Sequence, residues 1–109
     1  MKPLFSRHDR EKMTDEIRNY FMQQPVRRAW LFGSFARNEA REESDIDILV
    51  QFEESNNIDL FDFVGIKLDL EDLTGRQIDL VELGFEYDSI KSHIEEDKIL
   101  IYERQAEHN

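Results

Sequence analysis

The chain has 109 residues and no cysteine, and its 25 Asp and Glu against 14 Lys and Arg give a formal net charge of −11. This length predicts a single domain over residues 1–109, and the absence of cysteine excludes disulfides and thiolate metal sites. No long apolar run or signal peptide occurs, so we expect a cytoplasmic protein without membrane contact.

The charge is distributed unevenly along the chain. Residues 1–41 hold nine Lys and Arg against five Asp and Glu, a net charge of +4, whereas residues 42–109 hold five against twenty, a net charge of −15. So acidic a surface repels phosphate backbones, which disfavours direct nucleic-acid binding. It suits a basic protein partner or divalent cations, although most of the acids outside the strands are expected simply to form a solvated surface.

The secondary structure follows from hydrophobic periodicity and from turn residues. In chain order, we expect a helix over Asp9–Gln23, a strand over Val26–Phe32, a short helix to about Arg37, a strand over Asp45–Phe52, a helix over Asp59–Thr74, a strand over Ile78–Val81, a helix over Tyr87–Glu96 and a short strand over Ile99–Tyr102. Pro25 ends the first helix, Ser34 is the expected N-cap of the short one, and Gly75 closes the next. This order predicts an α/β or α+β domain with a small sheet.

Several large apolar residues are expected to lie in the core. Trp30, Phe32 and Phe35 are expected in the core or the sheet and not in a base-stacking platform. The helix from residue 59 to residue 74 carries a long apolar stripe between Leu60 and Leu73, which we also expect to be core. A surface for a partner is the alternative for that stripe.

Three aspartates lie at the beginnings of two predicted strands. Residues i and i+2 of a strand point the same way about 7 Å apart, so Asp45 and Asp47 share the face opposite Ile46 and Ile48. Asp79 likewise lies opposite the apolar residues of its own strand. Because the apolar faces pack toward one core, the three carboxylates are expected to converge on the other side of the sheet.

This arrangement predicts a site for magnesium and a nucleoside triphosphate. Two cations about 3.5–4 Å apart can hold the attacking and leaving oxygens of an in-line phosphoryl displacement. Clustered carboxylates repel one another and raise each other's pKa, a cost that a bound dication removes. Gly33 lets the backbone approach a phosphate, Ser34 offers its hydroxyl and amide at a helix N-terminus, and Arg37 can reach the same phosphates. Arg41 is a weaker candidate for that role.

Each of these signals is weak when taken alone. A Gly-Ser turn is usually only a turn, an Asp-x-Asp pair is common in acidic proteins, and Asp79 by itself is most simply a solvated strand residue. Their order along the chain and their positions on the strands together favour an enzyme site.

The segments Leu31–Arg37 and Ser44–Val50 resemble the minimal nucleotidyltransferases of the DNA polymerase β superfamily, and in particular the MntA-type antitoxins of HEPN/MNT toxin–antitoxin systems. The resemblance continues through Leu73–Val81 and Ile99–Arg104, so it covers most of the chain after the first helix. It implies a nucleotidyltransferase fold, in which helices flank a short mixed β-sheet.

The resemblance also implies a set of residue roles. Gly33 and Ser34 would bind the nucleotide phosphates, and Asp45, Asp47 and Asp79 would ligate magnesium in a two-metal site. The counterpart of Asp79 also helps to position or deprotonate the attacking hydroxyl. The implied reaction transfers AMP from ATP to a tyrosine hydroxyl of a cognate HEPN ribonuclease toxin, releasing pyrophosphate and silencing the toxin within a hetero-oligomer.

One departure and two alternatives remain. The family usually has glycine after the arginine, where this chain has Asn38, a residue that tolerates a left-handed backbone. The first alternative is a non-catalytic antitoxin that acts by binding alone. The second is nucleotidyl transfer to a small molecule such as an aminoglycoside, which usually requires a second substrate-binding domain.

Overall fold

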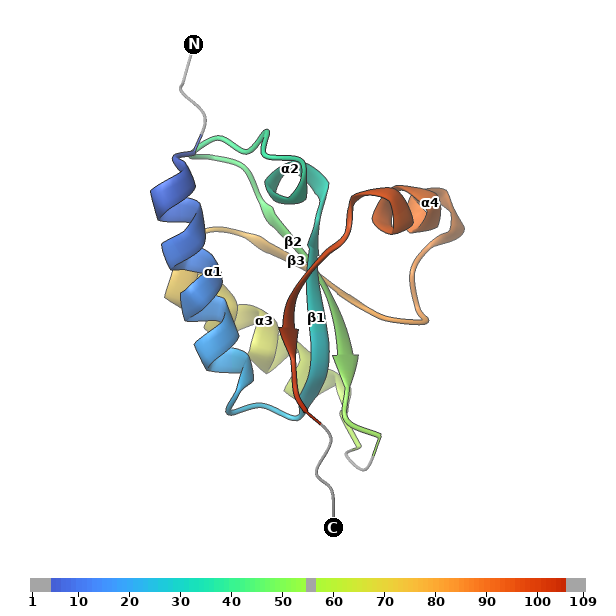
Figure 1. Ribbon diagram of the computed structural model, residues 1–109. Helices are drawn as coiled ribbons and strands as arrows, with labels where there is room; N and C mark the ends of the chain where they lie inside the picture. The colour runs from blue at the N-terminus through green and yellow to red at the C-terminus, as the bar shows by residue number, and fades with distance from the viewer. Residues whose placement is uncertain (1–4, 55–56, 106–109) are drawn as a thin grey trace.

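The computed structural model describes residues 5–54 and 57–105. Its elements, in chain order, are α1 (Arg7–Phe21), β1 (Val26–Phe32), α2 (Gly33–Ala36), β2 (Ile46–Phe52), α3 (Leu60–Thr74), β3 (Ile78–Glu82), α4 (Asp88–Asp97) and β4 (Ile99–Glu103) (Figure 1). Every helix and strand expected from the sequence is present, with ends that move by one or two residues.

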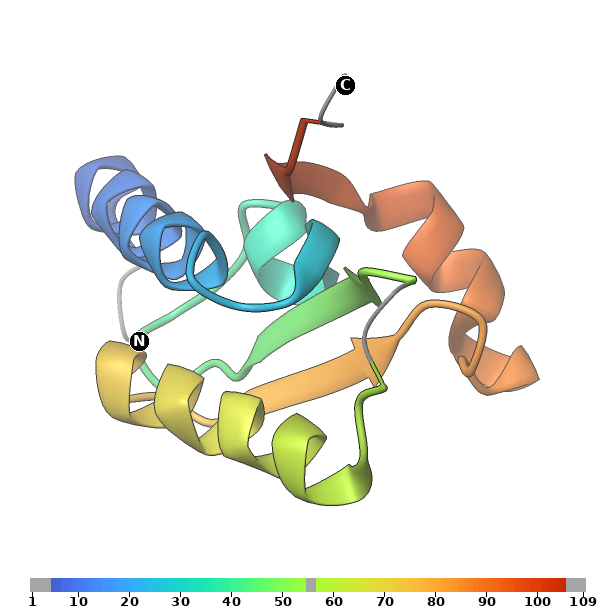
Figure 2. The ribbon, with the colours of Figure 1, turned by 90° about the horizontal axis from the view of Figure 1, so that it is seen from below.

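The four strands form one mixed sheet in the order β3-β2-β1-β4. Strand β1 is antiparallel to β2 and to β4, whereas β2 and β3 run parallel and are joined by the crossover helix α3. Helices α1 and α3 cover one face of the sheet, and α4 lies on the other (Figures 1 and 2). This architecture confirms the predicted α/β nucleotidyltransferase fold.

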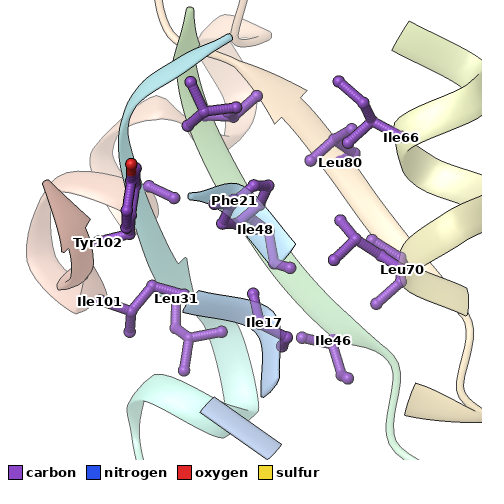
Figure 3. Packing of buried hydrophobic residues seen from close by; sticks show 14 of the residues in the cluster. Ile17, Phe21, Leu31, Ile46, Ile48, Ile66, Leu70, Leu80, Ile101 and Tyr102 are labelled. Carbon is purple, nitrogen blue, oxygen red and sulfur yellow. The ribbon is translucent and has the colours of Figure 1, made fainter. Parts of the chain in front are cut away.

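The main core lies between the sheet and the helices α1 and α3. Ile46 and Ile48 of β2 point into it and meet Ile17 of α1 and Leu70 of α3 (Figure 3). On the other face, a smaller cluster joins Leu49 to Ile94 of α4 and to buried Phe32. The alternation along β2 is therefore as predicted, except that its second face is covered by α4 over part of its length.

Polar groups fix the ends of the two long helices. The Ser6 side chain accepts a hydrogen bond of 3.0 Å from the Asp9 amide at the beginning of α1. Asp59 and Asp62 form a reciprocal capping box at the beginning of α3, and Gly75 ends that helix with φ of 67°. A left-handed glycine at this position satisfies the last carbonyls of a helix, as the sequence predicted.

Two expectations were wrong in detail. The N-cap of α2 is Phe32 and not Ser34, because the helical conformation already begins at Gly33. The apolar stripe of α3 is also only partly core: Ile66 and Leu70 are buried, whereas Leu60 and Phe61 are exposed. In the described part of the chain, no helix has both the length and the apolar character needed to cross a membrane.

Candidate active site

The backbone brings the three predicted aspartates to one end of the sheet. Asp47 and Asp79 are paired in the parallel register of β2 and β3, and neighbouring strands lie about 4.8 Å apart. Asp45 directly precedes β2, two residues before Asp47, and so shares its side of the strand. Asp47 is half-buried, while Asp45 and Asp79 are exposed to solvent.

The turn after β1 lies against these carboxylates. Because Phe32 pairs with Asp47 across β1 and β2, the next residue, Gly33, enters α2 directly beside the Asp47 side chain. Gly33 has φ of 69°, and a Cβ atom built on it would overlap Oδ2 of Asp47. The following residue, Ser34, lies in the first turn of α2, where the helix leaves amide groups without an intrahelical acceptor.

The electrostatics of the site are dominated by uncompensated negative charge. Burial raises the pKa of Asp47 to about 6, with further increases from the charges of Asp79 and Asp45 and an opposing effect of Arg37. Among the described residues, no donor hydrogen-bonds to the side-chain carboxylates of the three aspartates, and none of these carboxylates forms an ion pair within 4.0 Å. Oxygen ligands of this kind suit a hard divalent cation such as magnesium.

The three carboxylates lie near one another but do not by themselves form a complete metal-binding site. Within residues 5–54 and 57–105, no group of three or more His, Cys, Asp or Glu side chains is placed to hold a metal ion by itself. Magnesium is usually held by one or two carboxylates together with substrate phosphates and water. The arrangement therefore fits an ion that arrives with a nucleotide better than a permanent structural metal.

The Arg37 side chain lies beside the site and forms two ion pairs, one with Asp97 of α4 and one with Glu39 in the loop after α2. Its Nη1 atom is 2.7 Å from Oδ2 of Asp97, and its Nε atom is 3.3 Å from Oε2 of Glu39. Its charge also lowers the pKa of Asp47, so it is near enough to act on the carboxylates. The side chain is exposed, and a phosphate could compete for its donors.

Sequence reasoning missed Arg76, which positions the loop that carries Asp45. Its Nη1 atom donates to the carbonyl oxygens of Arg41 and Ser44, each at 3.1 Å, and to that of Glu42. Its guanidinium also lies over the ring of Phe5, 4.4 Å from the centroid. A hydrogen bond between residue 76 and a loop more than thirty residues earlier leaves no local signal in the sequence. The position of this arginine just before a strand was the one indication in the sequence that its side chain has a structural role.

Glu71 was also missed, and it fixes the beginning of β3. Its carboxylate accepts a 3.1 Å hydrogen bond from the Ile78 amide and a 2.9 Å one from Lys67. The Ile78 amide and then Lys67 lower the pKa of Glu71. The contact holds the backbone next to Asp79, the third aspartate.

The departure at position 38 is accommodated by the backbone. Asn38 has φ of 64° and is the one non-glycine residue with positive φ in the part of the chain that the structure describes. Asparagine adopts this left-handed conformation more readily than most residues. The turn after α2 therefore keeps a shape for which glycine is the usual choice.

The chain is similar in sequence and fold to known nucleotidyltransferases. The family model described as "Polymerase beta, Nucleotidyltransferase" matches residues 15–107. A candidate protein adenylyltransferase from Methanocaldococcus jannaschii is 44% identical over 69 residues, which are 63% of this chain and 72% of that protein. The structure of a candidate minimal nucleotidyltransferase superposes with a TM-score of 0.67 at 33% identity, over 87% of this chain and 98% of the other.

Two toxin–antitoxin structures share the fold. A complex crystallised with AMP-PNP has a TM-score of 0.70 at 19% identity, covering 84% of this chain and 74% of that one. A complex of a tri-AMPylated Shewanella oneidensis HEPN toxin with its MNT antitoxin has a TM-score of 0.59 at 18% identity, covering 89% and 71%. At these identities the likeness concerns the fold alone.

Proposed function

The chain belongs to the polymerase β nucleotidyltransferase family, and we propose that it transfers AMP from magnesium-bound ATP to a hydroxyl group of a partner protein. The observation that carries the proposal is the meeting of Asp47, Asp79 and the Gly33 turn at one end of the sheet. That combination places acidic ligands next to a backbone turn that approaches them closely.

The described residues divide the work in a simple way. Asp45 and Asp47 would hold the cations, and Asp79 would both help to hold them and orient the attacking hydroxyl, whose proton it can accept. Gly33 and Ser34 bind the triphosphate. When bound, magnesium neutralises charge on the transferring phosphoryl group and on the pyrophosphate that leaves.

Arg37 completes the phosphate side of the site. Its guanidinium offers several donors, and binding a phosphate would cost only exposed contacts to Glu39 and Asp97, one of which is already 3.3 Å long. Exposed ion pairs contribute little stability. Exchange of these acidic partners for ATP is therefore energetically reasonable.

The proposed acceptor is a tyrosine of a HEPN ribonuclease toxin, bound in a hetero-oligomer in the cytoplasm. The support is the name of the Methanocaldococcus jannaschii relative, a candidate protein adenylyltransferase, together with structural neighbours that are toxin–antitoxin complexes, one of them with a tri-AMPylated toxin. A single small domain offers an open site, which an acceptor presented by another protein would complete.

The direct test is incubation of the chain with magnesium, ATP labelled on its α-phosphate and, as the proposed partner, a HEPN-domain protein from the same organism. Label should appear on the HEPN protein, and mass spectrometry should find AMP on a tyrosine. The Asp47→Asn variant should lose transfer because a cation ligand is gone, while Asp88→Asn, an exposed change on α4, should keep it. No transfer by the wild-type chain would refute the proposal.

A binding-only antitoxin remains the second candidate, favoured by the exposed apolar face of α3. Growth of cells that express the toxin separates the two functions. Protection by Asp47→Asn equal to that by the wild type would assign neutralisation to binding. Loss of protection by a variant that still forms the complex would assign it to transfer.

A further inference from the structure

Helix α3 turns an apolar surface outward as well as inward. Leu60 and Phe61 are 72% and 86% exposed, and Leu68, about two turns further along the helix, is 53% exposed. These residues lie on the side opposite buried Ile66 and Leu70. In Figure 2, α3 is the outermost element on its side of the molecule, and no other element covers its outward face.

This outward face is not the ordinary scatter of apolar residues on a protein surface. Of the ten large apolar side chains that are exposed in the described part of the chain, five belong to α3. Four of these share the outward face at helical spacings of three or four residues, namely Leu60, Phe61, Val64 and Leu68. A helix that is apolar on all sides is normally buried, and a contiguous exposed apolar patch marks an interaction surface. We therefore expect this apolar patch to be buried against another molecule.

A glycine in the middle of α3 supplies a second, independent feature. Gly65 has ordinary helical φ, and a Cβ atom built on it would meet nothing within 4 Å. Alanine would stabilise a helix interior here, so glycine is not explained by packing within this chain. Gly65 instead opens into a hollow of about 360 Å³ whose border includes Pro25, Phe61 and the two acids Asp62 and Asp69, and this hollow can receive a side chain from outside.

The charges around the patch select its occupant. Helix α3 carries four acids, Asp62, Asp69, Glu71 and Asp72, and one base, Lys67, which is 2.9 Å from Glu71. A second copy of the chain would bring two such acidic borders together, which is unfavourable. A partner helix with an apolar ridge flanked by Lys and Arg would match both the patch and its borders.

We propose that the outward face of α3 is the docking surface for a basic amphipathic helix of the protein partner, with one basic side chain of that helix seated over Gly65, between Asp62 and Asp69. The inference rests on the proposed function for the identity of the partner, the HEPN protein that receives AMP. Because α3 and the aspartates lie on opposite faces of the sheet, the docking helix does not cover the nucleotide side, which stays accessible to ATP and to the acceptor tyrosine carried by another part of the partner.

The test is titration of the HEPN protein used in the transfer assay onto the full chain, measured by calorimetry at two salt concentrations. The double variant Phe61→Ser/Leu68→Ser should weaken the complex by about thirtyfold or more, as expected for apolar anchors at an interface centre. Phe85→Ser is the matched control, because Phe85 is 76% exposed in another part of the fold. It should leave the dissociation constant unchanged.

Gly65→Ala separates docking from folding. The extra methyl group should raise the thermal midpoint of the free chain by about 4–8 °C, because alanine favours the helix. It should nevertheless weaken the complex by about tenfold, because the hollow is filled. A gain in thermal stability with an unchanged dissociation constant for the HEPN protein would show that no partner side chain binds over Gly65.

The outcomes distinguish this inference from the proposed function. If the wild-type chain transfers AMP and Phe61→Ser/Leu68→Ser leaves both the dissociation constant and the KM for the HEPN protein unchanged, docking on α3 is wrong while the function stands. If no AMP is transferred but the double variant loses the complex, docking stands while the function fails. Failure of the wild-type chain to bind the HEPN protein at about 10 μM, or a Phe61-dependent homodimer in light scattering, overturns the inference.

Discussion

Gly33 and Asp47 come so close that a Cβ atom at position 33 would overlap Oδ2 of the carboxylate. The cause is the antiparallel register, which pairs Phe32 with Asp47 and so places the first residue after β1 against the second aspartate. The positive φ of 69° at Gly33 turns the chain at this point into α2. A phosphate-binding turn and a cation ligand are thus joined by one backbone contact.

The first prediction tests this contact by Gly33→Ala. The new Cβ would overlap Oδ2 of Asp47, so the turn and the carboxylate must separate, and AMP transfer should fall by at least about 100-fold, or about 2.7 kcal/mol in the activation free energy. Gly75→Ala is a matched control, since Gly75 has φ of 67° and open space around it. Both variants should lose about 1 kcal/mol of stability from left-handed strain.

The measurements are the unfolding free energy in urea and the rate of label transfer for both variants. Normal transfer by Gly33→Ala, or an equal loss in Gly75→Ala, would show that the contact with Asp47 has no role in the reaction.

The second prediction concerns pH and the stability of the metal-free chain. The pKa of Asp47 rises from an ordinary 3.8 to about 6 in the folded state, mainly through burial. The ionised form is therefore disfavoured on folding: the cost is absent below pH 4, grows as the pH rises through the folded pKa, and is complete above it. Asp47→Asn removes an ionisation cost of about 1–2 kcal/mol, after allowance for solvent screening.

The difference in unfolding free energy between Asp47→Asn and the wild type should therefore be larger at pH 7.5 than at pH 4, in the presence of a chelator. Asp72→Asn, at an exposed position on α3, is the control for the loss of one carboxylate outside the site. A difference for Asp47→Asn that shrinks as the pH rises would have the wrong sign for a buried carboxylate.

The candidate site residues could be proposed from the sequence because the signals that mark them are local. The spacing of Asp45 and Asp47 fixes a shared side of the strand, and the phase of Asp79 relative to Ile78 does the same for β3. The glycine that ends α3 and the positive φ at Asn38 are also properties of single residues. Such features need no knowledge of which strands pair.

The remaining features depend on contacts between distant segments. The hydrogen bonds of Arg76 to the loop before β2 and that of Glu71 to β3 arise only when α3 crosses between parallel strands. The burial of α3 was misjudged because both of its sides are apolar, so periodicity gives no preferred face. The burial of Leu49 in β2 was equally hidden from the sequence pattern, because α4 covers this residue on the face that it shares with the aspartates.

The third prediction is that Arg76→Lys weakens both folding and nucleotide binding. Lysine cannot reproduce the planar contacts with several carbonyl oxygens or the stacking over Phe5, which should cost about 1–3 kcal/mol. Because Asp45 follows the Ser44 carbonyl that Arg76 holds at 3.1 Å, the KM for ATP should rise more than kcat falls. Arg7→Lys is the control, since the side chain of Arg7 is 88% exposed.

Steady-state kinetics and urea unfolding of the two variants check this prediction. A loss of stability in Arg76→Lys with an unchanged KM for ATP would limit Arg76 to a structural role. A KM that changes equally in Arg7→Lys would trace the effect to general loss of positive charge.

The fourth prediction concerns the asparagine that replaces the usual glycine. Asn38 holds φ of 64° between Arg37 and the loop to β2, so Asn38→Gly should leave stability within about 0.5 kcal/mol and AMP transfer unchanged. Asn38→Ala should lose about 1–2 kcal/mol, because a Cβ without a local hydrogen-bonding group disfavours the left-handed region. If the turn sets the direction of Arg37, Asn38→Ala should also raise the KM for ATP, whereas a stability loss without a change in KM would separate the turn from phosphate binding.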